Sequence, residues 1–208
     1  QIIWPSLGNS ITMTGKKIIN RRKFIGSTAA AATTISIVPR HVIAGSGKTP
    51  PSEKIAIANI GCGTQGIREM GYMLNDDRVQ VVAVCDPNKY STNYLDWGPH
   101  TIRNLVRKGI GDPGWGSDLN GIPGGRDLGK LYVEGVYGQQ KRSGNYKGCK
   151  AYEDFRELLE EDDIDAVKIM TPDHLHATIA LAARDKGLDT LTHKPIANRM
   201  AEVRKVIK

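Results

Sequence analysis

Aromatic side chains are scarce in this 208-residue chain, at 6%, with two Phe and three Trp, which leaves little surface for stacking on nucleic-acid bases. Cysteine is scarce as well. Cys62, Cys85 and Cys149 have no metal-ligand spacing, and three cysteines suit no simple disulfide framework. No apolar run reaches the roughly 20 residues that cross a bilayer as a stable helix. With 25% charged and 39% hydrophobic residues, the composition is that of an ordinary globular chain rather than a disordered, collagen-like or membrane-bundle protein.

Acidic residues are absent from positions 1–44, although that stretch contains Lys16, Lys17, Arg21, Arg22, Lys23 and Arg40. The formal charge of +7 therefore falls to +7 − 6 = +1 for the rest of the chain. Because residues 45–208 are nearly neutral, they are not expected to form a surface that binds nucleic-acid phosphates, and no nucleic-acid partner is expected.

The paired arginines Arg21 and Arg22 precede an apolar stretch, 24–38, that is rich in Ala, Thr and Ser. A basic region followed by such a stretch is typical of an export signal, and this one is too short for a stable membrane anchor. Residues 13–44 resemble a twin-arginine signal, with cleavage expected after Ala44, which predicts a periplasmic or exported protein that uses the twin-arginine machinery. The alternative is a basic N-terminal helix.

Met13 is the first methionine, so residues 1–12 are interpreted as upstream, non-native sequence, and 45–53, rich in Gly, Pro and Ser, as a linker. From residue 54 onward, apolar runs alternate with helical patterns. Strands are predicted at 54–60, 79–85, 164–170 and 188–193. Helices are predicted at 64–75, at 152–159, from a Thr171 cap with Pro172 at the first helical position to Gly187, and from 198 onward.

This alternation predicts an α/β fold with a doubly wound parallel sheet over residues 54–208, the arrangement of a Rossmann dinucleotide-binding domain. The segment 87–150 is too long for an ordinary connection and holds more than half of the chain's 23 glycines. It is interpreted as an insertion at the sheet edge, with short helices at 102–108 and 128–137.

A glycine-rich turn, Gly61-Cys62-Gly63-Thr64-Gln65-Gly66, follows the first predicted strand and opens a helix. In this context the three glycines allow a tight turn, a close backbone approach to a pyrophosphate, and close helix–strand packing, while the N–H groups of Thr64 and Gln65 face the phosphates. Asp86 ends the second strand about 20 residues later, where a carboxylate accepts hydrogen bonds from the adenosine ribose. Its charge would repel the 2′-phosphate of NADP, so NAD is the expected cofactor. The alternative is a glycine-rich turn beside a solvated Asp86.

Residues 171–176, Thr-Pro-Asp-His-Leu-His, are followed by Ala182, Gly187 and the sequence His193-Lys194-Pro195. Together with the glycine turn and Asp86, and in this order, they resemble the Gfo/Idh/MocA oxidoreductases, the glucose-fructose oxidoreductase and inositol dehydrogenase superfamily. The resemblance spans residues 54–208. It implies an N-terminal fragment whose C-terminal α/β domain, the expected source of substrate contacts and of homo-oligomer contacts, is absent from this chain.

The resemblance implies that Lys194 is the catalytic-site lysine that contacts the substrate hydroxyl beside the nicotinamide. It places Thr171 and Pro172 at the cofactor and His176 near the same crevice. The family's glutamate before Lys-Pro is His193 here, which puts any role of that carboxylate in doubt. The family's further acid or base belongs to the second domain and has no counterpart in these 208 residues.

The predicted activity is NAD-dependent hydride transfer to or from a sugar, cyclitol or polyol. Two alternatives remain: a glycosidase that uses bound NAD for transient oxidation and elimination, and a non-catalytic dinucleotide-binding or sugar-sensing protein. No metal site is expected, because His174 and His176 are two positions apart and do not share a helix face. Cys62 and Cys85 are expected to be small buried fillers.

Overall fold

The computed structural model describes residues 49, 53–96, 98, 100–140 and 146–207. The predicted export signal (13–44), the stretch before it (1–12) and most of the linker (45–53) lie outside these residues. In chain order the elements are β1 (Ile55–Ile60), α3 (Thr64–Leu74), β2 (Val79–Cys85), β3 (Ser91–Tyr94), α4 (Thr101–Ile110), β4 (Ile122–Gly124), α5 (Arg126–Gln140), β5 (Lys150–Tyr152), α6 (Phe155–Leu158), β6 (Ala166–Ile169), α7 (Asp173–Asp185), β7 (Asp189–Thr192) and α8 (Met200–Val206).

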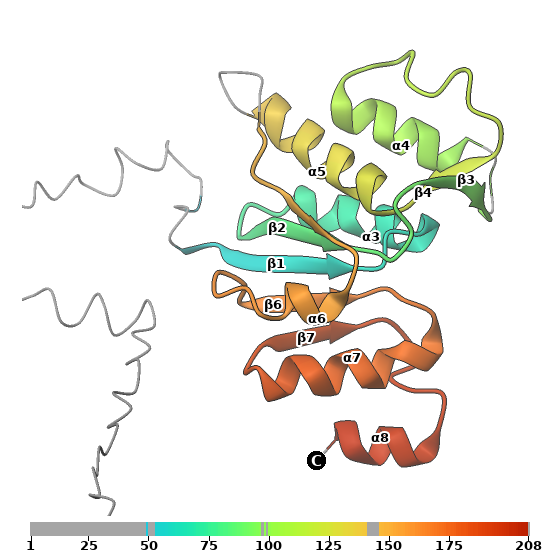
Figure 1. The fold of residues 1–208 in the computed structure, drawn as a ribbon. Helices are drawn as coiled ribbons and strands as arrows, with labels where there is room; N and C mark the ends of the chain where they lie inside the picture. Colours follow the sequence, from blue (N-terminus) through green and yellow to red (C-terminus); the bar gives the residue numbers. More distant parts are fainter. Residues whose placement is uncertain (1–48, 50–52, 97, 99, 141–145, 208) are drawn as a thin grey trace, which may run out of the picture. The chain divides into compact units, whose positions relative to one another are not determined.

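Five strands form one parallel sheet in the order β5-β2-β1-β6-β7 (Figure 1). The chain runs outward from β1 to β2 and β5, then crosses back to β6 and β7 on the other side. In open parallel sheets, such a reversal of strand order opens a crevice at the carboxyl ends of the strands, where ligands bind. The predicted doubly wound parallel sheet of the Rossmann type is confirmed.

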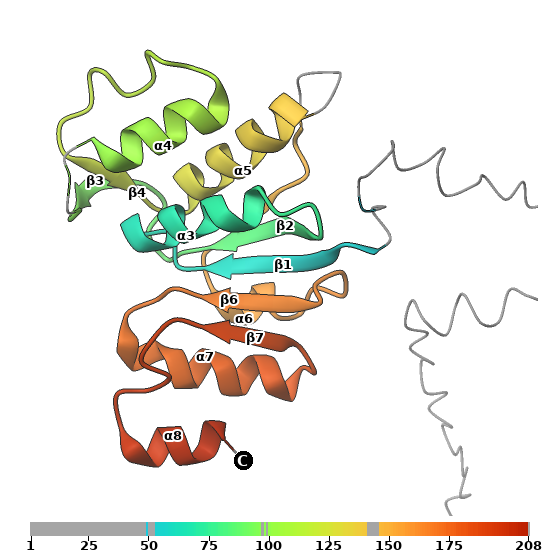
Figure 2. The same cartoon turned by 180° about the vertical axis from the view of Figure 1, so that it is seen from behind.

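Both faces of the sheet are covered, as Figures 1 and 2 show from opposite sides. On one face, α3 and α5 pack apolar side chains such as Ile67 and Val133 against the sheet, and α4 packs on these two helices through residues such as Val106. On the other face, α6 and α7 contribute Leu158 and Ile179. The central strands are buried on both sides, which explains why they are nearly continuous apolar runs in the sequence.

The helix after β6 begins one residue later than predicted. Pro172 is the N-cap of α7 and makes no side-chain cap, so Thr171 is not the capping residue. The predicted end is confirmed, because Gly187 follows the helix with a φ of +76° that favours glycine.

Tyr152 lies in a strand rather than in the predicted helix 152–159. It ends β5, which pairs with the end of β2, and α6 begins only at Phe155 after an Asp154 cap. A three-residue strand at the sheet edge has too little apolar pattern to be distinguished from the helix that follows it.

The segment 87–150 contains both predicted helices, each longer than expected, and a small antiparallel sheet of β3 and β4, which helix α4 separates in the chain. The interpretation of this segment as an insertion at the sheet edge is incomplete. Its helix α5 is part of the main core, to which it contributes Leu128, Tyr132 and Val133. In the described part of the chain, no helix has the length and apolar character needed to cross a membrane.

Candidate functional site

The glycine turn is held so close to β6 and α3 that two of its positions have no room for a side chain. A Cβ on Gly61 would lie 2.6 Å from the carbonyl carbon of Met170, and Gly61 has a φ of +101°. A Cβ on Gly66 would lie 2.0 Å from the carbonyl oxygen of Gly61. The first α-helical hydrogen bond runs from Ile67 N to Gly63 O, so the N–H groups of the first turn of α3 have no partner within the helix.

Asp86 is 8% exposed at the end of β2, and two backbone N–H groups hold its carboxylate. Oδ2 accepts a hydrogen bond from Cys62 N at 2.7 Å, and Oδ1 accepts one from Asn88 N at 2.8 Å. A carboxylate oxygen can accept two hydrogen bonds, so the Asp86 carboxylate still has acceptor capacity for a ligand. The glycine turn and the end of β2 are thereby fixed to each other.

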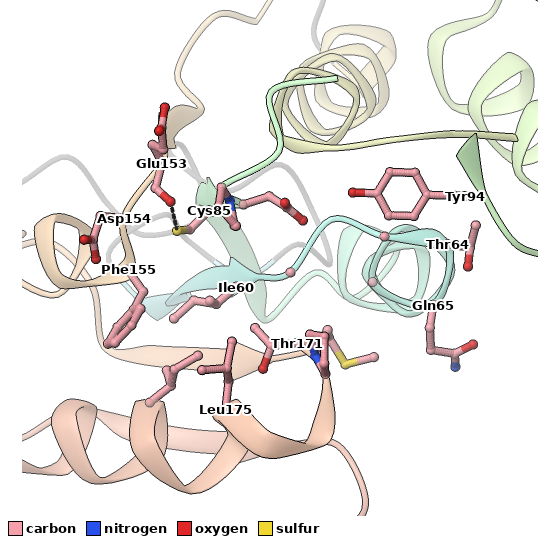
Figure 3. Close-up of a pocket in the computed structure, with 18 of the residues that line it drawn as sticks. Ile60, Thr64, Gln65, Cys85, Tyr94, Glu153, Asp154, Phe155, Thr171 and Leu175 are labelled. Atoms are coloured by element: carbon pink, nitrogen blue, oxygen red, sulfur yellow. Dashed lines mark hydrogen bonds between the residues drawn. The ribbon is translucent and has the colours of Figure 1, made fainter. Parts of the chain in front are cut away.

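These groups border a cavity of about 700 Å³, which we call the main cleft. The predicted site residues that line it are Gly61, Gly63, Thr64, Gln65, Gly66, Asp86, Thr171 and Pro172. At one end of the cleft lie Ile60, Phe155 and Leu175, and at the other end lie Tyr94 and Thr64 (Figure 3). The cleft therefore combines an apolar end with a polar edge of backbone N–H groups and a buried carboxylate.

His176 does not line the main cleft, and both of its ring nitrogens are engaged by the backbone. Nδ1 lies 2.6 Å from Pro195 O, and Nε2 lies 2.8 Å from Thr171 O, in a side chain that is 1% exposed. His176 thus joins the loop that contains Thr171 to the loop that contains Lys194. It acts on the site by positioning these loops, whereas the sequence predicted a residue next to the cofactor.

Lys194 is exposed and lines a second cavity of about 550 Å³, which we call the lysine cavity. The lysine cavity is lined by Thr64, Gln65, Arg68, Leu95, Asp96, His193 and Lys194. Because Thr64 and Gln65 border both cavities, the lysine cavity and the main cleft meet at the start of α3.

The lysine cavity also has a wall that comes from the segment 87–150. Asp96 is ion-paired with Arg68 of α3, and the hydroxyl of Thr64 donates to Leu95 O at 2.8 Å. These contacts attach the chain after β3 to the start of α3, beside Lys194.

Two aromatic residues of the cleft are among those that the sequence analysis did not predict. Tyr94 comes from β3, and Phe155 begins α6. Neither belongs to a motif, and each reaches the cleft only because its segment folds back over the sheet edge. The sequence shows Tyr94 only as an aromatic residue in a long glycine-rich segment, and this does not indicate that its side chain reaches the cleft.

The thiols near the cleft are protonated at neutral pH. Burial is the largest cause that raises the pKa of Cys62 well above its usual 9.0 and that of Cys85 to about 12, and the Asp86 charge adds to both shifts. All three cysteines are buried and free, which confirms the prediction that Cys62 and Cys85 are buried fillers. Thiolate chemistry is therefore not expected here.

The donor set fits a dinucleotide. The turn has the close backbone approach that a pyrophosphate requires, and Asp86 offers a fixed acceptor. The hydroxyl oxygen of Thr171, which lines the main cleft, is buried without a hydrogen-bond partner among the described residues. Across those same residues, no cluster of three or more His, Cys, Asp or Glu side chains is arranged to hold a metal ion.

Comparison with known proteins gives matches to parts of this chain. Residues 130–208 match the Gfo/Idh/MocA family model, described as an oxidoreductase family with an NAD-binding Rossmann fold. Over 44 residues the chain is 46% identical to levoglucosan dehydrogenase of Pseudarthrobacter phenanthrenivorans, covering 21% of this chain and 11% of that protein. Over 170 residues it is 27% identical to a glycosyl hydrolase family 109 protein of Stenotrophomonas maltophilia, covering 82% of this chain and 28% of that protein.

Among solved structures, myo-inositol dehydrogenase of Lactobacillus casei in complex with NAD(H) and myo-inositol is 18% identical, with a TM-score of 0.47 over 74% of this chain and 32% of that chain. The WlbA dehydrogenase of Bordetella pertussis in complex with NADH and UDP-GlcNAcA is 17% identical, with a TM-score of 0.44 over 74% and 33%. The chain thus spans about a third or less of the length of each of these four proteins.

Proposed function

We propose that this chain is the cofactor-binding domain of an exported NAD-dependent oxidoreductase of the Gfo/Idh/MocA family, acting on a sugar, cyclitol or polyol. The observation that carries the proposal is the contact between Asp86 and the glycine turn at the edge of the main cleft. The family match over 130–208 and the short match to a sugar dehydrogenase support the same class of reaction.

The main cleft would hold NAD across the carboxyl ends of the strands. The free N–H groups at the start of α3 would bind the pyrophosphate, and Asp86 would accept hydrogen bonds from the adenosine ribose. The apolar end, with Ile60, Phe155 and Leu175, would take the adenine. The Asp86 carboxylate would disfavour the 2′-phosphate of NADP, whereas the carboxylates of Glu153 and Asp154, which also line the cleft, are paired with Arg126 and Arg156.

When bound, the nicotinamide supplies the hydride donor or acceptor. The chain's own contribution is orientation and electrostatics. The Lys194 ammonium, on the lysine cavity next to the cleft, would hydrogen-bond the reacting oxygen of the substrate and stabilise negative charge that develops on it. His193 lines the same cavity, so it would provide an imidazole where the family resemblance implies a glutamate.

The finer parts of the proposal concern the whole protein. A C-terminal α/β domain would complete the substrate pocket and the contacts of a homo-oligomer, and the twin-arginine signal would export the folded protein. Cell fractionation tests the export step. A variant with Arg21→Lys and Arg22→Lys should stay in the cytoplasm, and unchanged export would contradict the signal.

Calorimetric titration with NAD and NADP tests the cofactor site, with circular dichroism on the same sample to verify folding. NAD should bind at least about tenfold more tightly than NADP, because Asp86 meets the ribose. Asp86→Ser should raise the ratio of NADP to NAD affinity, because it removes the charge that repels the 2′-phosphate together with an acceptor for the ribose. A folded chain that binds neither dinucleotide would refute the proposed function, and an unchanged preference in Asp86→Ser would refute the ribose assignment.

A second candidate function is a glycosidase that oxidises its substrate transiently with bound NAD. The match over 82% of this chain to a glycosyl hydrolase family 109 protein favours it. The two functions use the same cofactor site but differ in their balance of products. A glycosidase releases the sugar without net NADH, whereas a dehydrogenase forms NADH in proportion to its product.

A further inference from the structure

Tyr94 of β3 occupies a narrow slot between the glycine turn and β4. A Cβ on Gly124 would lie 2.5 Å from the Tyr94 ring, and a Cβ on Gly63 would lie 3.2 Å from it. The Tyr94 ring therefore fits between Gly63 and Gly124, where a side chain at either position would crowd it. It forms a fixed wall at one end of the main cleft, facing the start of α3 (Figure 3).

The Tyr94 hydroxyl is linked to the carboxylate of Asp86 through Asn88. The amide Nδ2 of Asn88 donates to the Tyr94 hydroxyl at 3.0 Å, while the backbone N of Asn88 donates to Asp86 Oδ1 at 2.8 Å. The hydroxyl points toward the side of the cleft where Cys85 ends β2 (Figure 3). Tyr94 thus lies beside the group that would hold the ribose.

The Tyr94 hydroxyl also keeps a proton to donate. It accepts from Asn88, and no acceptor for its own proton is found among the described residues. Burial, followed by the charge of Asp86, raises the pKa of Tyr94 above its usual 10.0. At neutral pH the group is a neutral O–H donor, which suits a hydroxyl of the ligand.

A guanidinium near this position is already engaged elsewhere. The Nη1 of Arg126 donates to the carbonyl oxygens of Asp86 and Pro87 at 3.1 and 3.0 Å, and its Nη2 pairs with Glu153 at 2.8 Å. Binding of a 2′-phosphate usually requires such a cation to face the ligand. Arg126 instead stabilises the loop after β2. Arg156, whose side chain lines the main cleft, is paired with Asp154 at 2.7 Å.

We propose that Tyr94 is a specificity-determining residue, whose O–H donates to the adenosine ribose and whose ring blocks the space that a 2′-phosphate would need. This inference rests on the proposed function, because it assumes that the main cleft binds NAD. It adds a residue of the segment 87–150 to the part of the cofactor site that the glycine turn and Asp86 form.

Two substitutions separate the two roles of Tyr94. Tyr94→Phe keeps the ring and removes the hydroxyl, so it should weaken NAD binding roughly three- to tenfold, the usual range for one hydrogen bond, and leave NADP binding weak. Tyr94→Ala removes the wall, so it should raise the ratio of NADP to NAD affinity at least about fivefold. Both are measured by calorimetric titration on the full chain, together with thermal unfolding.

Tyr90→Phe and Tyr90→Ala are the matched controls. Tyr90 lies on the same segment but is half-exposed and borders a different cavity. These variants should bind both dinucleotides as the wild type does.

The outcomes distinguish this inference from the proposed function. A wild-type chain that binds NAD, with Tyr94 variants indistinguishable from the Tyr90 variants, overturns the inference alone. A folded wild-type chain that binds neither dinucleotide overturns the proposed function and the inference with it. If Tyr94→Ala does not fold, Tyr94→Phe decides: wild-type affinity for NAD overturns the inference, and the expected loss supports it.

Discussion

His176 connects two loops of the candidate site without facing either cavity. Its ring nitrogens lie 2.6 and 2.8 Å from the carbonyl oxygens of Pro195 and Thr171. A neutral imidazole has one N–H and donates to one carbonyl at a time, whereas donation to both requires the protonated ring. In either form the side chain fixes the distance between the end of β6 and the loop with Lys194.

Replacing His176 by Ala should therefore destabilise the fold and loosen the site. It removes the hydrogen bonding of the ring to Thr171 O and Pro195 O and leaves a void where the buried ring was, so the free energy of unfolding should fall by about 2–4 kcal/mol. NAD affinity should fall as well, because Thr171 borders the main cleft.

His174→Ala, on the exposed side of the same helix, is the control, with an expected change within about 0.5 kcal/mol. Urea denaturation and calorimetric titration measure both quantities. Equal stability of the two variants would contradict the positioning role.

Helix α3 depends on its closeness to β1, and Gly66 makes that closeness possible. A Cβ there would lie 2.0 Å from the backbone oxygen of Gly61, an atom that cannot move without opening the turn. Since the turn and the start of α3 form one unit, a change at Gly66 affects packing and phosphate binding together.

Gly66→Ala should lower the free energy of unfolding by several kcal/mol, on the order of 2–4 kcal/mol, and abolish measurable NAD binding. Gly114→Ala serves for comparison, because a Cβ at Gly114 would meet only an ordinary contact, 3.4 Å from Asp112 Oδ1. Thermal unfolding and titration with NAD provide the two measurements. Wild-type stability in Gly66→Ala would show that α3 can shift away from the sheet.

For the whole molecule, buried thiols make stability depend on pH in the alkaline range. Burial is the largest cause that raises the pKa of Cys85 and of Cys149 from 9.0 to about 12. The native state keeps these protons between about pH 9 and 12, while unfolded thiols lose them. The unfolded state then binds fewer protons, so the free energy of unfolding falls as the pH rises through this range.

Cys149→Ala should reduce the slope of that fall. Each buried thiol contributes at most about 1.4 kcal/mol per pH unit above its unfolded pKa, and removing one removes its share. Urea denaturation under reducing conditions at about pH 8, 9 and 10 measures the slope. Tyr72→Phe, at an exposed position, should leave the slope unchanged. A wild-type slope in Cys149→Ala would mean that burial does not raise the pKa of the Cys149 thiol in the native state.

Much of the fold could be predicted because neighbouring residues determine it. Apolar runs identify β1, β2 and β6, and the helical pattern from Thr64 identifies α3. The segment 87–150 was harder. Its helices were expected, but the packing of α5 into the main core depends on contacts with strands distant in sequence.

The candidate site also has a part that the sequence predicts and a part that it does not. The glycine turn and Asp86 were predictable, because a short spacing along one strand–helix–strand unit places them together. The positions of Tyr94, Phe155 and the two carbonyl partners of His176 were not. Tyr94 packs on Gly63, and Pro195 O meets His176, only because separate segments pack together, and no local pattern encodes such contacts.

The sequence by itself determined the parallel α/β sheet and the dinucleotide-type turn, because backbone sterics and side-chain periodicity act over a few residues. Only the tertiary structure decided that His176 positions two loops, that Lys194 lies on a separate cavity next to the main cleft, and that Tyr94 stands beside Asp86. These contacts follow from how distant segments pack, since a side chain's partners are set by where its backbone is held.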